Sequence, residues 1–159
     1  MAQYKNEKIV GFPLQEVFRI YKKTAKRDFP KFNEKEAVGI SASRQVGAYG
    51  NKKTTMLVTI TGYEPNKLYE VTSTHKDITY KSRYEFNSID ENTTKITLIE
   101  ETHGSGGVFE VINNVLAIVI YRWKVKKRFK ALILGLEKEV QDVRNRVEKS
   151  KPKEIEKDN

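Results

Sequence analysis

The chain has 159 residues, with 30 lysines and arginines against 21 aspartates and glutamates, so its formal net charge at pH 7 is +9. This length fits one domain that buries about 70% of the surface its unfolded chain exposes. The chain contains no cysteine, which excludes disulfides, thiolate metal sites and a cysteine nucleophile. Its longest apolar run, residues 115–121, is shorter than the ~20 residues that span a bilayer, and its first residues do not resemble a signal peptide, so we expect a cytoplasmic protein.

The N-terminal segment predicts a short strand within residues 3–12, followed by a helix over residues 13–29. Pro13 suits the first position of this helix because its missing amide hydrogen would have no partner there. Apolar residues then recur at spacings of three and four, which predicts one buried helical face: Leu14, Val17, Phe18, Tyr21 and Ala25.

Between residues 37 and 103 the apolar period changes to two, which predicts strands over 37–47, 54–62, 68–74, 78–86 and 94–103. Short turns join these strands, so we expect an antiparallel meander with one apolar face. The side chains that we expect on this inner face are Val38, Ile40, Ala42, Val46, Met56, Val58, Ile60, Tyr69, Val71, Ser73, Ile78, Tyr80, Ser82, Tyr84, Phe86, Ile96 and Leu98.

The C-terminal segment predicts a long helix that covers this face. Its apolar stripe contains Ile118, Val125, Phe129, Leu132, Leu136, Val140, Val143 and Val147. A continuous helix over 108–147 would measure about 60 Å, far more than a ~15 Å radius of gyration accommodates, so we expect a break and a long helix that begins within 114–121. We place the domain at residues 1–148 and expect residues 149–159 to form a disordered charged tail.

The order of strand, helix, antiparallel meander and long helix is that of the α+β helix-grip fold. The stretches "FPLQEVFRIY", "TITGYEPNKLYEVTS", "ITYKSRYEF", "TTKITLIEE" and "KRFKALILGLEKEV" resemble the polyketide cyclase/START (SRPBCC, Bet v 1-like) superfamily. Within it the chain is most similar to single-domain proteins of low-GC Gram-positive bacteria that have no characterised function. The resemblance implies a curved sheet of about six strands wrapped around the C-terminal helix.

The resemblance also implies a cavity between the sheet and that helix, which in many relatives holds an apolar molecule. Hydroxyl groups on the inner face support this, because a buried hydroxyl needs a partner that a dry core does not supply. The alternative is that these groups bond to one another or to edge water. The predicted lining is Met56, Val58, Tyr69, Val71, Tyr80, Ser82, Tyr84, Phe86, Leu98, Glu100, Arg122, Val125, Phe129 and Leu132.

Arg122 is the polar residue on the apolar stripe of the C-terminal helix, seven residues before Phe129. Glu100 continues the inward phase of Ile96 and Leu98. Arg122 therefore has three alternative roles, which are an internal ion pair with Glu100, a clamp on a ligand carboxylate or phosphate, and an exposed position in solvent.

The sequence assigns no catalytic residue, metal ligand or cofactor. His75 and His103 are the two histidines, and neither has a companion at metal-ligand spacing. The sequence "GSGG" at residues 104–107 lacks the lysine of a phosphate-binding loop, so we interpret it as a hinge. Lys124, Lys127, Arg128 and Lys130 predict a basic outer helix face, with Trp123 and Leu134 as its outward apolar groups.

The sequence thus predicts a non-catalytic carrier or sensor of a small hydrophobic or amphipathic molecule. The alternatives are an enzyme of the polyketide cyclase type and a basic adaptor. For the adaptor we expect weak contact with an anionic membrane surface rather than nucleic acid, because the outer sheet face lacks aromatic groups on which bases stack. The sequence predicts no oligomeric state.

Overall fold

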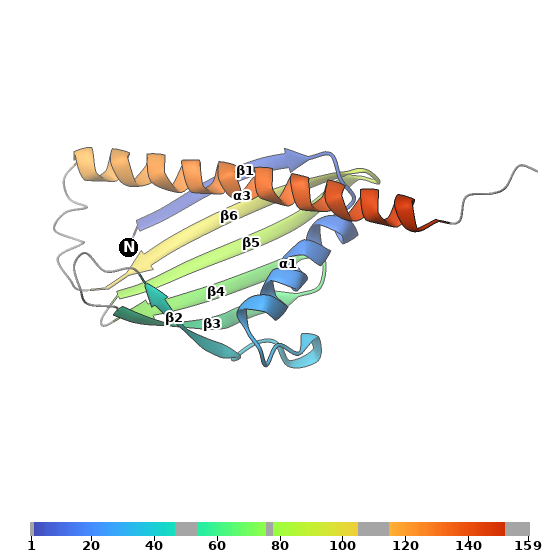
Figure 1. Cartoon of the computed structure of the whole chain (residues 1–159). Coiled ribbons are helices and arrows are strands. Elements are labelled where there is room, and N and C mark those ends of the chain that lie inside the picture. Colours follow the sequence, from blue (N-terminus) through green and yellow to red (C-terminus); the bar gives the residue numbers. More distant parts are fainter. Residues whose placement is uncertain (1, 47–53, 76–77, 105–114, 152–159) are drawn as a thin grey trace, which may run out of the picture.

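The computed structural model describes residues 2–46, 54–75, 78–104 and 115–151, and these form a curved sheet with two helices across one face (Figure 1). The sheet is antiparallel throughout, with strand order β1-β6-β5-β4-β3-β2. This arrangement confirms the predicted helix-grip fold. The strands are β1 Ala2–Val10, β2 Ser41–Val46, β3 Thr54–Glu64, β4 Leu68–His75, β5 Ile78–Asp90 and β6 Thr93–His103.

Helix α1 spans Leu14–Asp28 and follows Pro13, as its sequence predicts. Four of the five predicted face residues are buried, and Leu14 is half-buried. Ile20 is also buried at 7% exposure, so the buried face of α1 is wider than the predicted stripe. The C-terminal end of α1 points towards the β2 side of the sheet, where a 3₁₀ turn, η1 Glu34–Glu36, follows.

The prediction for the first meander strand is partly wrong. Strand β2 begins at Ser41 rather than at residue 37, and Val38 is 59% exposed. The reason is the backbone of Gly39, whose φ of +95° turns the chain before the strand. Ile40 and Ala42 do face the core, whereas the side chain of Val46 lies outside the described residues.

The later strands agree with the predicted periods, and short turns set their registers. Asn66, with φ of 60°, occupies the left-handed position in the turn between β3 and β4, where the Lys67 amide donates to the Glu64 carbonyl at 3.0 Å. Gly62 lies beside an irregularity in the β3–β4 register, and a Cβ there would approach Glu70 Cβ to 3.0 Å. A side chain at this position would therefore push the two strands apart.

Helix α3 spans Val115–Ser150 as one element across the sheet (Figure 1). It begins within the predicted interval, whereas the predicted break and most of the "GSGG" hinge fall in 105–114, outside the described residues. Val125, Phe129, Leu136 and Val140 are buried as predicted. Ile133 is buried in addition, while Val147 is 53% exposed, because the last turns of α3 extend past the sheet.

Two ion pairs join α3 to α1 above the sheet. Arg144 donates to both carboxylate oxygens of Glu16 at 2.7 and 2.9 Å, and this interaction lowers the pKa of Glu16. Lys23 Nζ lies 2.7 Å from Glu139 Oε1. These pairs connect the two helices at the surface, where an ion pair contributes about 1 kcal/mol or less. The expected tail boundary at residue 149 falls within α3, and residues 152–159 lie outside the described range.

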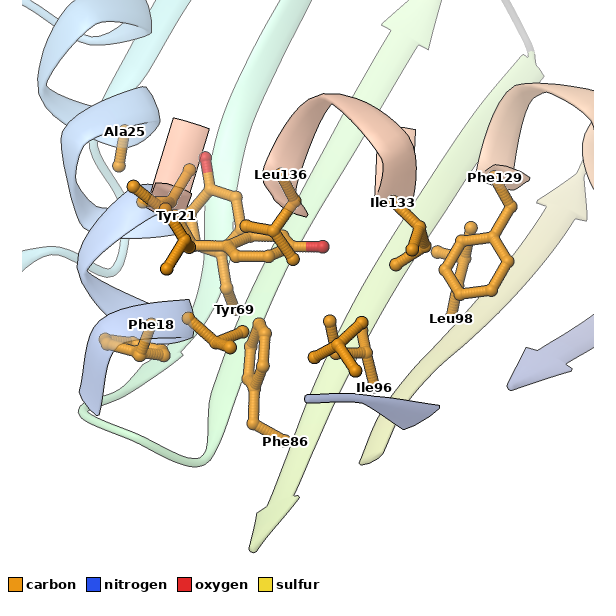
Figure 2. Packing of buried hydrophobic residues seen from close by; sticks show 14 of the residues in the cluster. Phe18, Tyr21, Ala25, Tyr69, Phe86, Ile96, Leu98, Phe129, Ile133 and Leu136 are labelled. Atoms are coloured by element: carbon orange, nitrogen blue, oxygen red, sulfur yellow. The ribbon is translucent and has the colours of Figure 1, made fainter. Parts of the chain in front are cut away.

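The core lies between the helices and the inner face of the sheet. Figure 2 shows Phe18 and Tyr21 of α1 beside Tyr69 and Phe86 of the sheet, and the α3 side chains reaching down towards Ile96 and Leu98. The Phe86 ring meets Tyr21 at 4.7 Å and Phe18 at 5.3 Å between centroids, both edge-on. Such aromatic contacts add specific packing to the burial of apolar area.

Candidate functional site

A cavity of about 500 Å³ lies on the inner face of the sheet. Helix α1, strands β2 to β5 and helix α3 all contribute to its wall. Helix α1 is therefore part of the site that we had expected only between the sheet and the C-terminal helix. We call this space the tyrosine cavity. Its lining is Ile20, Tyr21, Thr24, Arg27, Asp28, Arg44, Val58, Tyr69, Val71, Ser73, Ser82, Tyr84, Leu132, Gly135, Leu136 and Glu139.

Three tyrosines from three elements meet in the tyrosine cavity. The ring of Tyr21 lies 5.0 Å from that of Tyr84 and 6.2 Å from that of Tyr69, centroid to centroid. Tyr21 is only 6% exposed, yet its hydroxyl has no hydrogen-bond partner in the described part of the chain. A buried hydroxyl without a partner is costly, so Tyr21 places an unmet polar group in the wall of the cavity.

Burial also sets the protonation of these tyrosines. It raises the pKa of Tyr21 well above its ordinary value, and burial is likewise the main cause of the raised pKa of Tyr69. For Tyr84, burial and then the nearby Glu100 carboxylate raise the pKa to about 12. All three phenols are therefore neutral at pH 7, where they can donate or accept a hydrogen bond but do not act as bases.

A second hollow, of about 300 Å³, continues the inner face towards the start of β5 and the end of β6. It shares Ser73 and Ser82 with the tyrosine cavity, so the two spaces adjoin at these residues. We call it the carboxylate hollow after Glu100. Its lining is Met56, Ser73, Tyr80, Lys81, Ser82, Glu100, Glu101, Thr102 and Arg128.

Glu100 is a charged residue in a nearly closed position, with 4% exposure. Strand pairing places it directly opposite Ser82 on β5. Its Oε1 atom accepts from Ser82 Oγ at 3.4 Å and also from Arg128 Nη2. Its Oε2 atom is buried and has no partner among the residues that the structure describes. One carboxylate oxygen is therefore bonded, and the other can still accept.

Most of the charged residues around both spaces are paired within the same lining. At the tyrosine cavity, Asp28 holds Arg44 at 2.6 Å and Arg27 at 3.1 Å. At the carboxylate hollow, Arg128 pairs with Glu100, and Lys81 Nζ lies 3.8 Å from Glu101. Each lining has two basic and two acidic residues. The described lining residues therefore sum to a formal charge of zero, within a chain of net charge +9.

Most of the predicted lining residues lie at these two spaces. Ser82 lies at both, and Val58, Tyr69, Val71, Tyr84 and Leu132 line the tyrosine cavity. Met56, Tyr80 and Glu100 line the carboxylate hollow. The remaining predicted residues whose side chains are described are buried and border neither space: Phe86, Leu98, Val125 and Phe129.

Glu100 has a partner that the sequence did not predict. Arg128 bonds to it, although the sequence had placed Arg128 on the outer face of the helix. Its side chain is 66% exposed, so it crosses from that face to reach the carboxylate. The side chain of Arg122 lies outside the described residues, and its predicted roles stay predictions.

Sequence reasoning missed the wall contributed by α1 and by the strand β2. Tyr21 was predicted to be buried, but the one-sided pattern of α1 does not distinguish a packed residue from one beside a cavity. Ser73 was on the predicted inner face, so its alternation with Tyr69 and Val71 could have assigned it to the lining. Arg44 and Asp28 carry no such signal, because only the folded chain brings them together.

A third, smaller groove of about 260 Å³ lies between β1 and α3 on the other side of the helix, where Lys126, Lys130 and Leu134 line it. As expected, Trp123 and Leu134 are exposed, at 61% and 57%. Lys127 Nζ lies 5.2 Å from the centre of the Trp123 ring. The described lining of this groove has three lysines against two glutamates, so it differs in charge from the inner site.

Within the described ranges, no three histidine, aspartate or glutamate side chains gather where they could hold a metal ion. The described helices also include none with an apolar stretch long enough to cross a bilayer.

Comparison with known sequences gives one family. The model of the family described as "Domain of unknown function (DUF3284)" matches residues 5–122, which include nearly the whole sheet, α1 and the first turns of α3. No curated protein matches the sequence.

Solved structures show the same fold at low sequence identity. The protein TTHA0849 from Thermus thermophilus is 18% identical, with a TM-score of 0.60 over 89% of this chain and 99% of its own. The Zhui aromatase/cyclase from a Streptomyces species is 11% identical, with a TM-score of 0.54 over 88% of this chain and 93% of its own. A START superfamily protein from Mycobacterium smegmatis is 8% identical, with a TM-score of 0.57 over 89% of this chain and 98% of its own. At such identities these similarities establish the helix-grip fold.

Proposed function

The chain belongs to the DUF3284 family. For this member we propose that it binds a small amphipathic molecule in the tyrosine cavity and the adjoining carboxylate hollow, as a non-catalytic carrier or sensor. The similar structures include an aromatase/cyclase and a START superfamily protein, so the fold is compatible with ligand handling. We extend the proposal to a cytoplasmic protein with one domain over residues 1–148, of the type found in low-GC Gram-positive bacteria.

The observation that carries the proposal is the unmet polar groups that line the joined space. A core packed for stability alone leaves few buried polar atoms without partners. Here the hydroxyl of Tyr21 and the Oε2 atom of Glu100 both lie buried without a partner in the described residues. Together with the volume of the cavity, they match the usual ligand site, which is mostly apolar with a few placed polar groups.

The tyrosines favour binding over catalysis. A general base needs a pKa near the working pH, whereas burial raises the pKa of Tyr84 to about 12. The Glu100 carboxylate is already bonded to Arg128 and Ser82. An enzyme of the polyketide cyclase type stays the second candidate, and it predicts that a bound molecule leaves the protein chemically changed.

The direct test is native mass spectrometry of the purified full chain, followed by solvent extraction and identification of the released compounds. We expect a discrete added mass that disappears on denaturation. If the protein is purified empty, titration with an environment-sensitive apolar dye should give saturable, one-to-one binding. A protein that is empty and takes up neither dye nor small aromatic compounds would contradict the proposal.

The matched variants are Val71→Trp and Val38→Trp. Val71 lines the tyrosine cavity, so an indole there should fill the space and lower dye affinity at least tenfold. Val38 is exposed outside the sheet, so the same substitution should leave the affinity unchanged. Equal dye affinity in both variants would show that the dye binds outside the tyrosine cavity. A separate incubation of the wild-type protein with the extracted compound tests the enzyme alternative, which predicts that the compound is chemically converted.

A further inference from the structure

The acceptor in the carboxylate hollow indicates which chemical class the site selects. We propose that the site takes an uncharged molecule with a hydroxyl group on a ring system, and that this hydroxyl donates to Glu100 Oε2. The inference rests on the proposed binding function and adds its selectivity, namely alcohols and phenols over carboxylates and over unsubstituted hydrocarbons.

The first argument is the balance of donors and acceptors. Among the buried side-chain atoms that the structure describes, the one in the hollow without a partner is a carboxylate oxygen, which can only accept a hydrogen bond. The two cations that line the hollow, Arg128 and Lys81, already face Glu100 and Glu101. Among the residues that the structure describes, no further cation lines the hollow. An incoming carboxylate would therefore meet a buried negative charge, whereas a hydroxyl supplies a donor.

The second argument is charge. Burying an unpaired charge beside Glu100 is much more costly than burying a neutral polar group. A cationic amine would gain from Glu100 but would be repelled by Arg128, which is bonded to the same carboxylate. The formal neutrality of both linings therefore favours an uncharged molecule, despite the basic surface of the chain.

The third argument is the spacing along β5. Ser82 lies opposite Glu100, and Tyr84 lies opposite Leu98, two residues further along the strand. Two strand residues span about 7 Å, so a molecule with its hydroxyl at Glu100 places its second ring among Tyr84, Tyr69 and Tyr21. Their rings, 5.0 to 6.4 Å apart between centroids, present apolar faces to such a ring system. The dimensions suit a ligand of at least two fused rings.

The test compares three ligands of one shape, 2-naphthol, naphthalene and 2-naphthoate, in direct binding titrations at neutral pH. We expect 2-naphthol to bind at least tenfold more tightly than each of the other two, because a hydrogen bond to a charged group contributes about that much or more. Glu100→Gln should reduce the preference over 2-naphthoate several-fold, since it removes the negative charge. Glu100→Leu should abolish the preference over naphthalene.

The matched control is Glu85→Gln, on the same strand as Ser82 but outside both linings, where all three affinities should stay unchanged. Equal binding of the three ligands to the wild-type protein would overturn the inference and leave the proposed binding function standing. Binding of none of them, with no dye uptake, would overturn both. The wild-type comparison decides the inference even if a Glu100 variant fails to fold.

Discussion

The inner face of strand β6 changes character halfway along. Ile96 and Leu98 are 0% and 1% exposed and pack under α3, whereas Glu100 and Thr102, equally buried at 4% and 3%, border the hollow. Strand β5 repeats the change, from the packed ring of Phe86 to Tyr84 and Ser82. One half of the sheet therefore contributes stability through close packing, and the other half keeps polar groups that no packed core requires.

The largest expected effect is in the packed half. Phe86→Ala should lower the free energy of unfolding by about 3–5 kcal/mol, because it leaves a cavity among Tyr21, Phe18 and the sheet. Urea denaturation measures this loss. The matched control is Ser82→Ala, four residues earlier on the same face, which should change the stability by less than about 1 kcal/mol. Equal losses would erase the distinction between the two halves.

The ion pair of the hollow should give an intermediate effect. Arg128→Leu should lower the free energy of unfolding by about 1–3 kcal/mol, because the buried Glu100 carboxylate loses its charged partner. Combining it with Glu100→Leu should restore or exceed the wild-type stability, since apolar pairs of similar volume replace buried ion pairs well. The double variant should nevertheless lose the preference for 2-naphthol. A double variant less stable than Arg128→Leu would contradict the claim that the unpaired Glu100 carboxylate causes the loss of stability.

High pH should weaken the fold through the buried phenols. The pKa of Tyr84 rises from 10.0 to about 12 on folding, so above pH 10 the unfolded chain loses a proton that the folded chain retains. The contribution is fully present below pH 10 and is lost as the pH rises towards 12. Between pH 9 and pH 11 it amounts to about 1 kcal/mol. Tyr84→Phe should flatten the pH dependence of unfolding by this amount, and an unchanged slope would contradict the assignment.

The smallest expected effect is a gain in stability. Tyr21→Phe should leave the stability unchanged or raise it by up to about 1 kcal/mol, because it removes a buried hydroxyl that lacks a partner in the described residues. Tyr63→Phe is the control, since the Tyr63 hydroxyl donates to Glu34 at 3.3 Å and its loss should be neutral or slightly destabilising. Thermal unfolding compares the two. A loss above about 1 kcal/mol for Tyr21→Phe would show that its hydroxyl is already satisfied.

The packed half was the more predictable one from sequence. Its residues follow periods of two and of three to four, so Ile96 and Phe129 could be assigned to the core from spacing alone. Val38 and Val147 were assigned wrongly because periodicity does not show where a strand begins or where a helix passes beyond its sheet. The resemblance to a helix-grip family supplied the rest of the fold.

The polar half was predictable only in part. The phase of β6 placed Glu100 inward, and that of β5 placed Ser82 inward. The partner of Glu100 could not be predicted, because Arg128 has an outer helical position and reaches the carboxylate through its long side chain. The wall contributed by α1 and the pairing of Asp28 with Arg44 depend on contacts between elements distant in sequence, which a local pattern does not encode.

The most direct test of the central claim is a titration of the isotope-labelled protein with 2-naphthol, followed by amide and side-chain chemical shifts. The account predicts saturable shifts at Ser73, Ser82, Glu100 and Tyr84, with small changes at Phe86 and Ile96. Shifts that cluster instead around Lys126 and Leu134 would place binding in the outer groove and contradict the claim that the polar half of the sheet is the binding half.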